Sequence, residues 1–268
     1  MPSGVLIRAR CKAGFTPWRA DTYFVLEPGG CFVGRAAGEE VLMGRKKAAP
    51  EWGTDALRYA DFSGVVQKGQ SILKGIDPKG VDVYLFLMDR FARTAVTDDL
   101  VFQYVYRLWY GLEAAKLRPE FLRRYFELME AARKAIDIHS VAEELFGIAN
   151  KKGRQKLQFS FVTKLVHTAD PTRPLYDKNI GRYFRFQPSG MGTSEFATSI
   201  QRYLPFYEDL GRCYQRILDD GVLSGVVQSF SDTYSALVPE TKILDFIFWS
   251  AGSQGLLVRF PAAAGGSQ

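Results

Sequence analysis

The sequence has few of the residues that metal centres and disulfide frameworks need. It contains only two histidines, His139 and His167, and they lack the paired spacing of metal ligands. The three cysteines, Cys11, Cys31 and Cys213, are odd in number and share no metal-like spacing, which is typical of free thiols in a reducing compartment. We therefore expect neither a bound metal nor a disulfide scaffold.

Long apolar runs are also missing. The opening MPSGVLIRARC has no apolar stretch of signal-peptide length. No run of about 18 residues is free of charge, and even the apolar KILDFIFWSAGS contains Asp245. A phosphate-binding loop of the Walker type and a nucleophile elbow are absent too, so we expect no nucleotide cofactor. These absences predict a cytoplasmic protein with no membrane partner and no cofactor.

Aromatic residues and positive charge, by contrast, are plentiful. Aromatics make up 14% of the 268 residues, and the net charge is +6. Hydrophobic residues at 47% and charged residues at 24% are typical of a globular chain with a sizeable core. A basic chain suits an anionic partner such as nucleic acid.

The pattern along the chain predicts a mainly α protein with a small β-leaning region at the N-terminus. Short β-prone runs such as DTYFVLE and GCFVGR are broken by glycine and proline, whereas apolar residues recur at helical spacing from about residue 82. The predicted divisions are a β-leaning region (1–50), a linker with the first helical elements (51–80), a helical domain (81–255) and a flexible tail (256–268).

One predicted helix has a well-defined apolar row. Val101, Tyr104, Val105, Leu108 and Leu112 follow the helical period of about 3.6 residues. We therefore expect these five side chains to face the core.

The stretch RPLYDKNIGRYFRF (173–186) carries the main functional signal. Pro174 leads into Asp177, and a run follows in which apolar and basic residues interleave. An aspartate at the start of a helix accepts backbone N–H bonds and is favoured by the helix dipole. On these grounds alone, Asp177 is predicted to be an N-cap.

The same stretch resembles a segment of helix-hairpin-helix DNA glycosylases. Pro174, Asp177, Ile180 and Arg182 match the family pattern Pro-x-x-Asp-x-x-Val-x-Arg in order and spacing, with Ile in place of Val. The longer TKLVHTADPTRPLYD is similar to poorly characterised bacterial oxoguanine-glycosylase-like proteins. The resemblance implies a helical bundle of the helix-hairpin-helix glycosylase fold, in a DNA repair hydrolase that cleaves the N-glycosidic bond of a damaged base. It also implies that Asp177 stabilises the positive charge that develops on the sugar.

Bifunctional members of that family attack the sugar with a lysine a little under twenty residues before the aspartate. Lys156 lies 21 residues before Asp177 and Lys164 lies 13 before it, so both are candidates. Lys164 is equally well explained as a surface lysine whose stem packs along a helix. Tyr176 and Tyr183 could stack on an extruded base, although both suit a helical core equally well.

Positive charge is concentrated around this motif. Residues 151–190 contain nine basic side chains and two acidic ones, an excess of +7, so the rest of the chain sums to −1. A glycine turn that is flanked by cations and opens a helix would offer backbone N–H groups to a phosphate. The candidate nucleic-acid-binding residues are Lys151, Lys152, Gly153, Arg154, Lys178, Arg182 and Arg185.

Three kinds of function therefore remain open. The first is a nucleic-acid-binding protein that acts as a DNA glycosylase. The second is a non-catalytic helical protein of the same fold, acting as a nucleic-acid-binding or defence-associated interaction module. The third is a plain helical interaction protein whose basic face only keeps it in solution.

Overall fold

A computed structural model describes residues 55–186, 188, 195–235 and 237–260, together with the backbone of two strands near the N-terminus. The chain divides into two compact units between Ala48 and Ala49, close to the expected boundary at residue 50. The predicted tail beyond residue 260 and residues 51–54 of the predicted linker lie outside the described residues.

The first unit contains an antiparallel strand pair. β1 (Tyr23–Leu26) pairs with β2 (Phe32–Arg35) in a register that sets Tyr23 opposite Arg35 and Leu26 opposite Phe32. Both strands lie within the β-prone runs DTYFVLE and GCFVGR. The described part of this region is therefore β, as expected.

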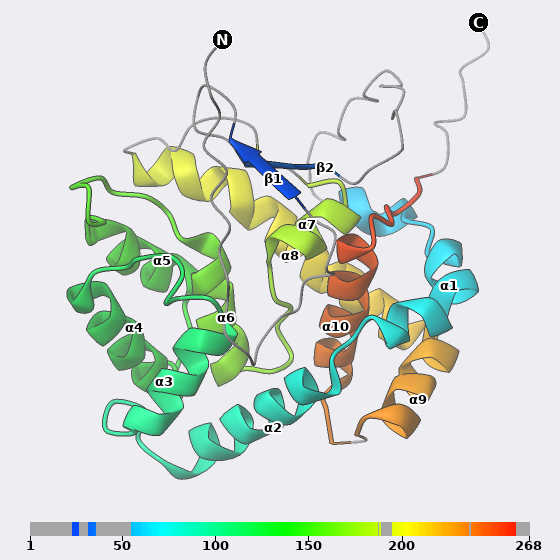
Figure 1. Cartoon of the computed structure of the whole chain (residues 1–268), viewed down its shortest axis with the longest axis horizontal. Helices are drawn as coiled ribbons and strands as arrows, with labels where there is room; N and C mark the ends of the chain where they lie inside the picture. Colours follow the sequence, from blue (N-terminus) through cyan, green and yellow to red (C-terminus); the bar gives the residue numbers. More distant parts are fainter. Residues whose placement is uncertain are drawn as a thin grey trace, which may run out of the picture. The chain divides into compact units, whose positions relative to one another are not determined.

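The second unit is helical, which confirms the mainly α prediction (Figure 1). A short 3-10 helix, η1 (Ala56–Tyr59), comes first. The helices that follow are α1 (Ser63–Lys74), α2 (Pro78–Arg93), α3 (Leu100–Trp109), α4 (Pro119–Ala131), α5 (Ile138–Gly147), α6 (Phe159–Ala169), α7 (Lys178–Tyr183), α8 (Phe196–Asp219), α9 (Ser224–Thr233) and α10 (Glu240–Ser253).

Aspartate caps define the starts of several helices. The side chains of Asp77, Asp99 and Asp137 accept backbone N–H bonds at the first turns of α2, α3 and α5. Pro78 and Pro119 occupy first-turn positions, where the missing N–H costs nothing. These local signals explain why short helices of 10 to 16 residues begin where they do.

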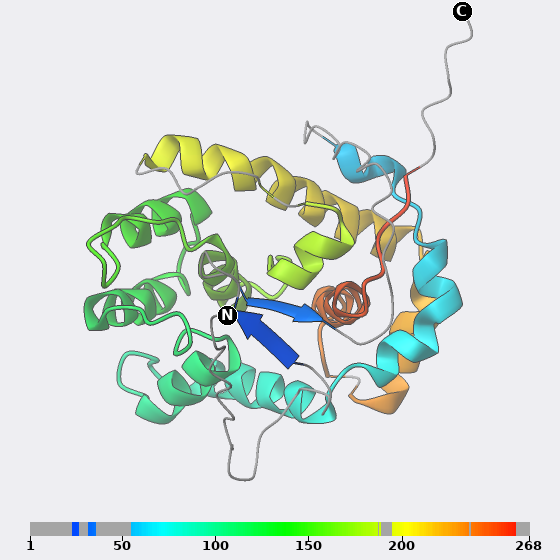
Figure 2. The ribbon, with the colours of Figure 1, turned by 45° about the horizontal axis from the view of Figure 1, so that its top comes forward.

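Helices α6 and α10 form the centre of this unit. Figure 2 views both nearly end-on, with the other helices around them. α4 and α5 pack against α6, whereas α1, α7, α8 and α9 pack against α10. Both central helices are almost entirely buried. Any polar side chain on them must therefore find its partners inside the protein.

The apolar face expected for α3 is wrong at three of its five positions. Val101, Tyr104 and Leu108 are exposed, whereas the side chains that α3 buries are Phe102 and Tyr106. These two rings have more area to bury, and the Tyr106 hydroxyl also lies within hydrogen-bond distance of the Tyr125 and Thr168 hydroxyls. The larger aromatic row therefore faces the core. Of the predicted row, Val105 is partly buried and Leu112, beyond the end of α3, is buried, whereas the other three side chains point outward.

None of the helices within the described ranges combines the length and the hydropathy that crossing a bilayer would require.

Candidate functional site

Asp177 is the N-cap of α7, as predicted. Its Oδ1 accepts hydrogen bonds from Asn179 N at 2.7 Å and from Ile180 N at 3.2 Å. Its backbone is extended (φ −145°, ψ 170°), which is the usual conformation of an N-cap residue. The side chain is half-buried, so the carboxylate stands at the boundary between solvent and core.

The segment before Asp177 is fastened to both central helices. Leu175 N donates to Asp245 Oδ1 on α10 at 3.0 Å. Tyr176 N donates to Thr163 Oγ1 on α6 at 3.1 Å, and the same hydroxyl lies 3.2 Å from Tyr176 O. These bonds hold the Asp177 backbone against α6 and α10 together.

Lys164, on α6, is buried. Its side chain does not reach solvent along the helix surface, since the residue is only 9% exposed. The ammonium donates to Tyr110 O at 3.1 Å and lies 5.2 Å from the centre of the Phe161 ring. Burial lowers the pKa of this amine, and the negative charge of Asp177 partly opposes the shift. Lys164 is therefore a desolvated amine that interacts electrostatically with the Asp177 carboxylate.

A second buried lysine comes from α10. Lys242 is 4% exposed, and its ammonium lies 3.9 Å from Asp245 Oδ2 and 4.7 Å from the centre of the Phe246 ring. Burial lowers the pKa of Lys242; the charge of Asp245 opposes this shift, and that of Lys164 adds to it. The two amines therefore lie in one electrostatic environment.

Asp245 lies at the centre of this environment. Its Oδ1 accepts from Leu175 N and, at 3.2 Å, from the Tyr214 hydroxyl. Its Oδ2 has no hydrogen-bond partner among the described residues. Burial raises the pKa of this carboxyl, and Lys242 partly lowers it again.

His167, on α6, is a buried and neutral histidine near Asp245. Burial lowers its pKa to about 3, so the imidazole is uncharged near neutral pH. Its Nδ1 lies 2.6 Å from Arg173 O, and its Nε2 lies 3.3 Å from the Tyr84 hydroxyl. With the proton on Nδ1, the ring donates to Arg173 O and accepts from Tyr84. The 3.9 Å approach of Nδ1 to Asp245 is then not an ion pair.

We call Lys164, His167, Lys242 and Asp245 the buried polar cluster, with Asp177 at its edge. An amine held in a desolvated place loses its proton more easily and becomes a nucleophile. A carboxylate beside it can stabilise a cation that forms during a reaction. Both properties are among those that attack by an amine at a carbon developing positive charge requires.

Sequence reasoning overlooked half of this cluster. From the sequence, Asp245 was noted only as a charge within an apolar run, and no role was predicted for Asp245 or Lys242. A signal for them exists, because two strongly apolar helices each have a lysine followed three residues later by a second titratable side chain: Lys164 with His167, and Lys242 with Asp245.

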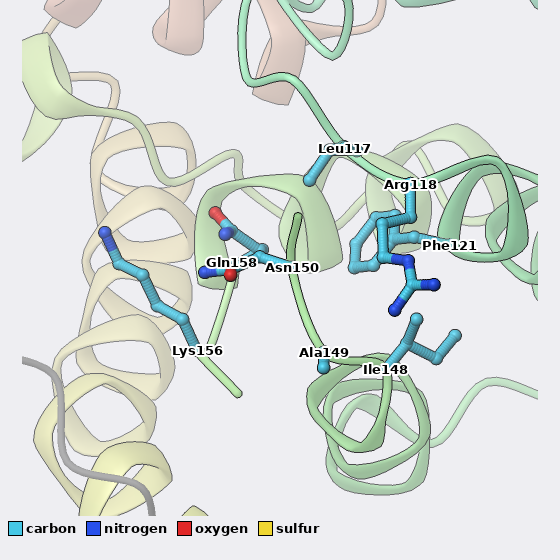
Figure 3. Close-up of a pocket in the computed structure, with 8 residues that line it drawn as sticks. All are labelled: Leu117, Arg118, Phe121, Ile148, Ala149, Asn150, Lys156 and Gln158. Carbon is cyan, nitrogen blue, oxygen red and sulfur yellow. The ribbon is translucent and has the colours of Figure 1, made fainter. Parts of the chain in front are cut away.

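The structure places the other candidate lysine, Lys156, elsewhere. Lys156 is exposed and lines a small hollow of about 10 Å³, which has room for about one water molecule. Figure 3 shows it across this hollow from Arg118 and Phe121. Lys156 therefore does not belong to the buried polar cluster.

The glycine turn at Gly153 differs from the expected phosphate-binding turn. Asn150 Oδ1 accepts from Lys152 N and Arg154 N, and Asn150 O accepts from Gly153 N. α6 begins only at Phe159, so the turn does not open the helix. The backbone amides are occupied internally, and only the exposed cationic side chains remain for an anion.

The basic side chains after Asp177 differ in their exposure to solvent and in their hydrogen bonds. Lys178 is exposed and Arg182 is half-buried. Arg185 donates from Nε to Val258 O at 3.0 Å, and its backbone is left-handed, with φ +60°. Arg185 therefore fixes the end of α7 against the segment after α10.

The two candidate stacking residues pack into the core. Tyr176 is 9% exposed and contacts the rings of Phe186 and Phe206 edge-on. Tyr183 is 2% exposed and stacks on Phe248 with ring centres 4.9 Å apart. In this structure both rings are buried among protein side chains, which leaves no room for a base.

Within the described ranges, no group of three His, Cys, Asp or Glu side chains is arranged to hold a metal ion. Comparisons of the chain with protein-family models, with curated proteins and with solved structures found no match.

Proposed function

We propose that this chain binds nucleic acid and cleaves the N-glycosidic bond of a damaged base. In this proposal the Lys164 amine is the nucleophile, and Asp177 stabilises the positive charge that develops on the sugar. The observation that supports it most is a desolvated amine, Lys164, next to Thr163, whose hydroxyl holds the segment that leads into the helix-capping Asp177 carboxylate.

The chemistry fits the environment of each group. Desolvation favours the neutral amine, which is the form that attacks carbon. The N-cap bonds hold the Asp177 carboxylate in place before any substrate arrives, so little reorganisation is needed when charge develops nearby. Lys156 lies outside the buried polar cluster, and we therefore choose Lys164 between the two lysines that the sequence left open.

The charge distribution supports nucleic acid as the partner. Lys151, Lys152 and Arg154 are exposed on the turn between α5 and α6, and Lys178 is exposed on the first turn of α7. Cationic side chains on turns and helix ends are typical contacts to a phosphate backbone, which fix position without reading sequence.

An assay of base release tests the proposal. Asp177→Asn keeps a good N-cap and should lower the free energy of unfolding by less than about 1 kcal/mol. The neutral amide cannot oppose a developing cation, so the rate of base release should fall by about a hundredfold or more. Melting curves and a panel of damaged duplexes measure the two effects. Release of no base from any duplex by the wild-type protein would rule out the enzyme.

One observation favours a non-catalytic nucleic-acid-binding module as the second candidate. The Lys164 ammonium already has a hydrogen-bond acceptor in Tyr110 O and two flanking rings, an arrangement that also suits a purely structural lysine. Salt-sensitive DNA binding without base release would favour this second function.

A further inference from the structure

The outward face of α3 is unusually apolar. Among the described residues, twelve large hydrophobic side chains are exposed, and five of them lie on this one helix. Scattered single exposed residues are normal, but a contiguous group marks an interaction surface. Four of them share one side of the helix, and we call these the α3 apolar face: Leu100, Val101, Tyr104 and Leu108. Trp109 lies on another side, where its ring packs on Gly80.

We propose that the α3 apolar face is the contact through which two copies of this chain form a twofold-symmetric dimer. The inference is independent of the proposed enzymatic function. A twofold contact requires a patch that complements itself, since each copy presents the same surface to the other. The spacing and the charges of α3 meet that requirement.

The spacing is symmetric about one residue. Leu100 and Leu108 are 76% and 52% exposed, and each lies four residues from Tyr104, which is 59% exposed. Residues four apart lie on one face of a helix. When two copies of α3 cross antiparallel at Tyr104, Leu100 of each copy meets Leu108 of the other, and the two tyrosines meet at the axis.

The charges at the two ends of α3 favour the same antiparallel arrangement. Asp98 is exposed just before the helix and Lys116 is exposed after it, and neither side chain has an ion-pair partner within the described part of the chain. Antiparallel pairing brings the acidic end of one copy towards the basic end of the other. It also sets the two helix dipoles in opposite directions, which is favourable.

Nucleic acid fits this face poorly. Arg107 is the one cation within α3, and it is half-buried and paired with Glu113. A surface without free cations cannot neutralise phosphates.

The size of the face indicates a weak dimer. Stable interfaces bury about 800 Å² on each partner, which is more than one face of a ten-residue helix provides. We therefore expect association in the micromolar range, with a mass that depends on protein concentration.

Sedimentation over a concentration series tests the proposal. The wild-type mass should rise from that of one chain towards that of two. Leu108→Glu should raise the dissociation constant at least tenfold. Leu237→Glu is the matched control, because Leu237 is 81% exposed and belongs to the connection between α9 and α10. It should leave the dissociation constant unchanged, and circular dichroism should show native helicity for both variants.

Cysteine cross-linking gives a second readout that does not depend on losing a contact. Tyr104→Cys should form a disulfide-linked dimer under mild oxidation, whereas the wild-type chain and Leu237→Cys should not. A monomeric mass at every concentration, or a Tyr104→Cys chain that does not cross-link, would overturn the proposal. If Tyr104 were also protected from labelling in the monomer, another part of the chain would cover the face.

Discussion

Local rules predicted Asp177 well at the scale of single residues, but they did not predict Lys164. An N-cap depends on the few residues that follow it, and Asp177 bonds to Asn179 N and Ile180 N as such a rule requires. The burial of Lys164 depends instead on Tyr110, which is 54 positions away in the sequence. Spacing along the chain could therefore name two candidate lysines without choosing between them.

His167 gives a prediction about stability and pH. Its pKa falls from 6.5 to about 3 on folding, because the ring is buried. Between these two values, the imidazole binds a proton in the unfolded chain but not in the folded chain. The resulting stability is complete above the unfolded pKa and is lost as the pH falls from 6.5 towards 3. Through His167 alone, the free energy of unfolding should fall by about 2 kcal/mol between about pH 7 and pH 5.

Urea unfolding of the wild-type chain and of His167→Gln at the two pH values measures this loss of unfolding free energy. The carboxyl of Asp245, with its raised pKa, titrates in the opposite sense, so the difference between the two proteins isolates His167. His139→Gln removes an exposed histidine and serves as the control. Equal pH dependence in the wild-type chain and His167→Gln would show that His167 contributes nothing.

At the scale of elements, α3 shows why a correct helix can be given the wrong face. The row that contains Tyr104 and the row of Phe102 and Tyr106 both follow the helical period, so periodicity alone cannot choose between them. The choice depends on α4 and α6, which offer the Tyr125 and Thr168 hydroxyls to Tyr106. Helix positions were therefore predictable from sequence, whereas helix orientation required the neighbours.

The packing of α7 on α10 gives a second prediction. A Cβ atom at Gly252 would lie 2.0 Å from Asn179 O and 2.8 Å from Asn179 C, and backbone atoms cannot give way cheaply. Gly252→Ala should therefore lower the free energy of unfolding by roughly 1–3 kcal/mol or more, because α7 must shift. Denaturant melts measure this loss. Since α7 begins at Asp177, base release should also fall.

Gly225→Ala on α9 is the matched control. A Cβ atom there would meet nothing within 4 Å, and alanine is the better helix former. It should raise stability by about 0.5–1 kcal/mol. Equal effects of the two substitutions would contradict the close approach of α7 to α10.

At the scale of the whole molecule, the concentration of positive charge predicts salt-sensitive binding. Each phosphate contact adds about 0.9 to the slope of log affinity against log salt on duplex DNA. Neutralising the turn between α5 and α6 should flatten that slope and weaken binding to all sequences alike. The test is a fourfold alanine variant at Lys151, Lys152, Arg154 and Lys156, measured by salt titration.

A second fourfold variant controls for net charge. It removes the same charge from exposed lysines outside this turn, namely Lys68, Lys74, Lys79 and Lys134. The slope should then stay close to that of the wild-type protein. If the two variants behave alike, only the total charge matters, and the turn is a solvated surface.

Trapping the reaction intermediate tests the central claim most directly. If the Lys164 amine attacks the sugar and releases the base, borohydride should reduce the resulting imine to a stable protein–DNA adduct. Proteolysis and mass spectrometry then identify the modified lysine. We expect the adduct on Lys164 and its loss in Lys164→Gln. An adduct on Lys156 or Lys242, or binding of damaged DNA without any adduct, would contradict it.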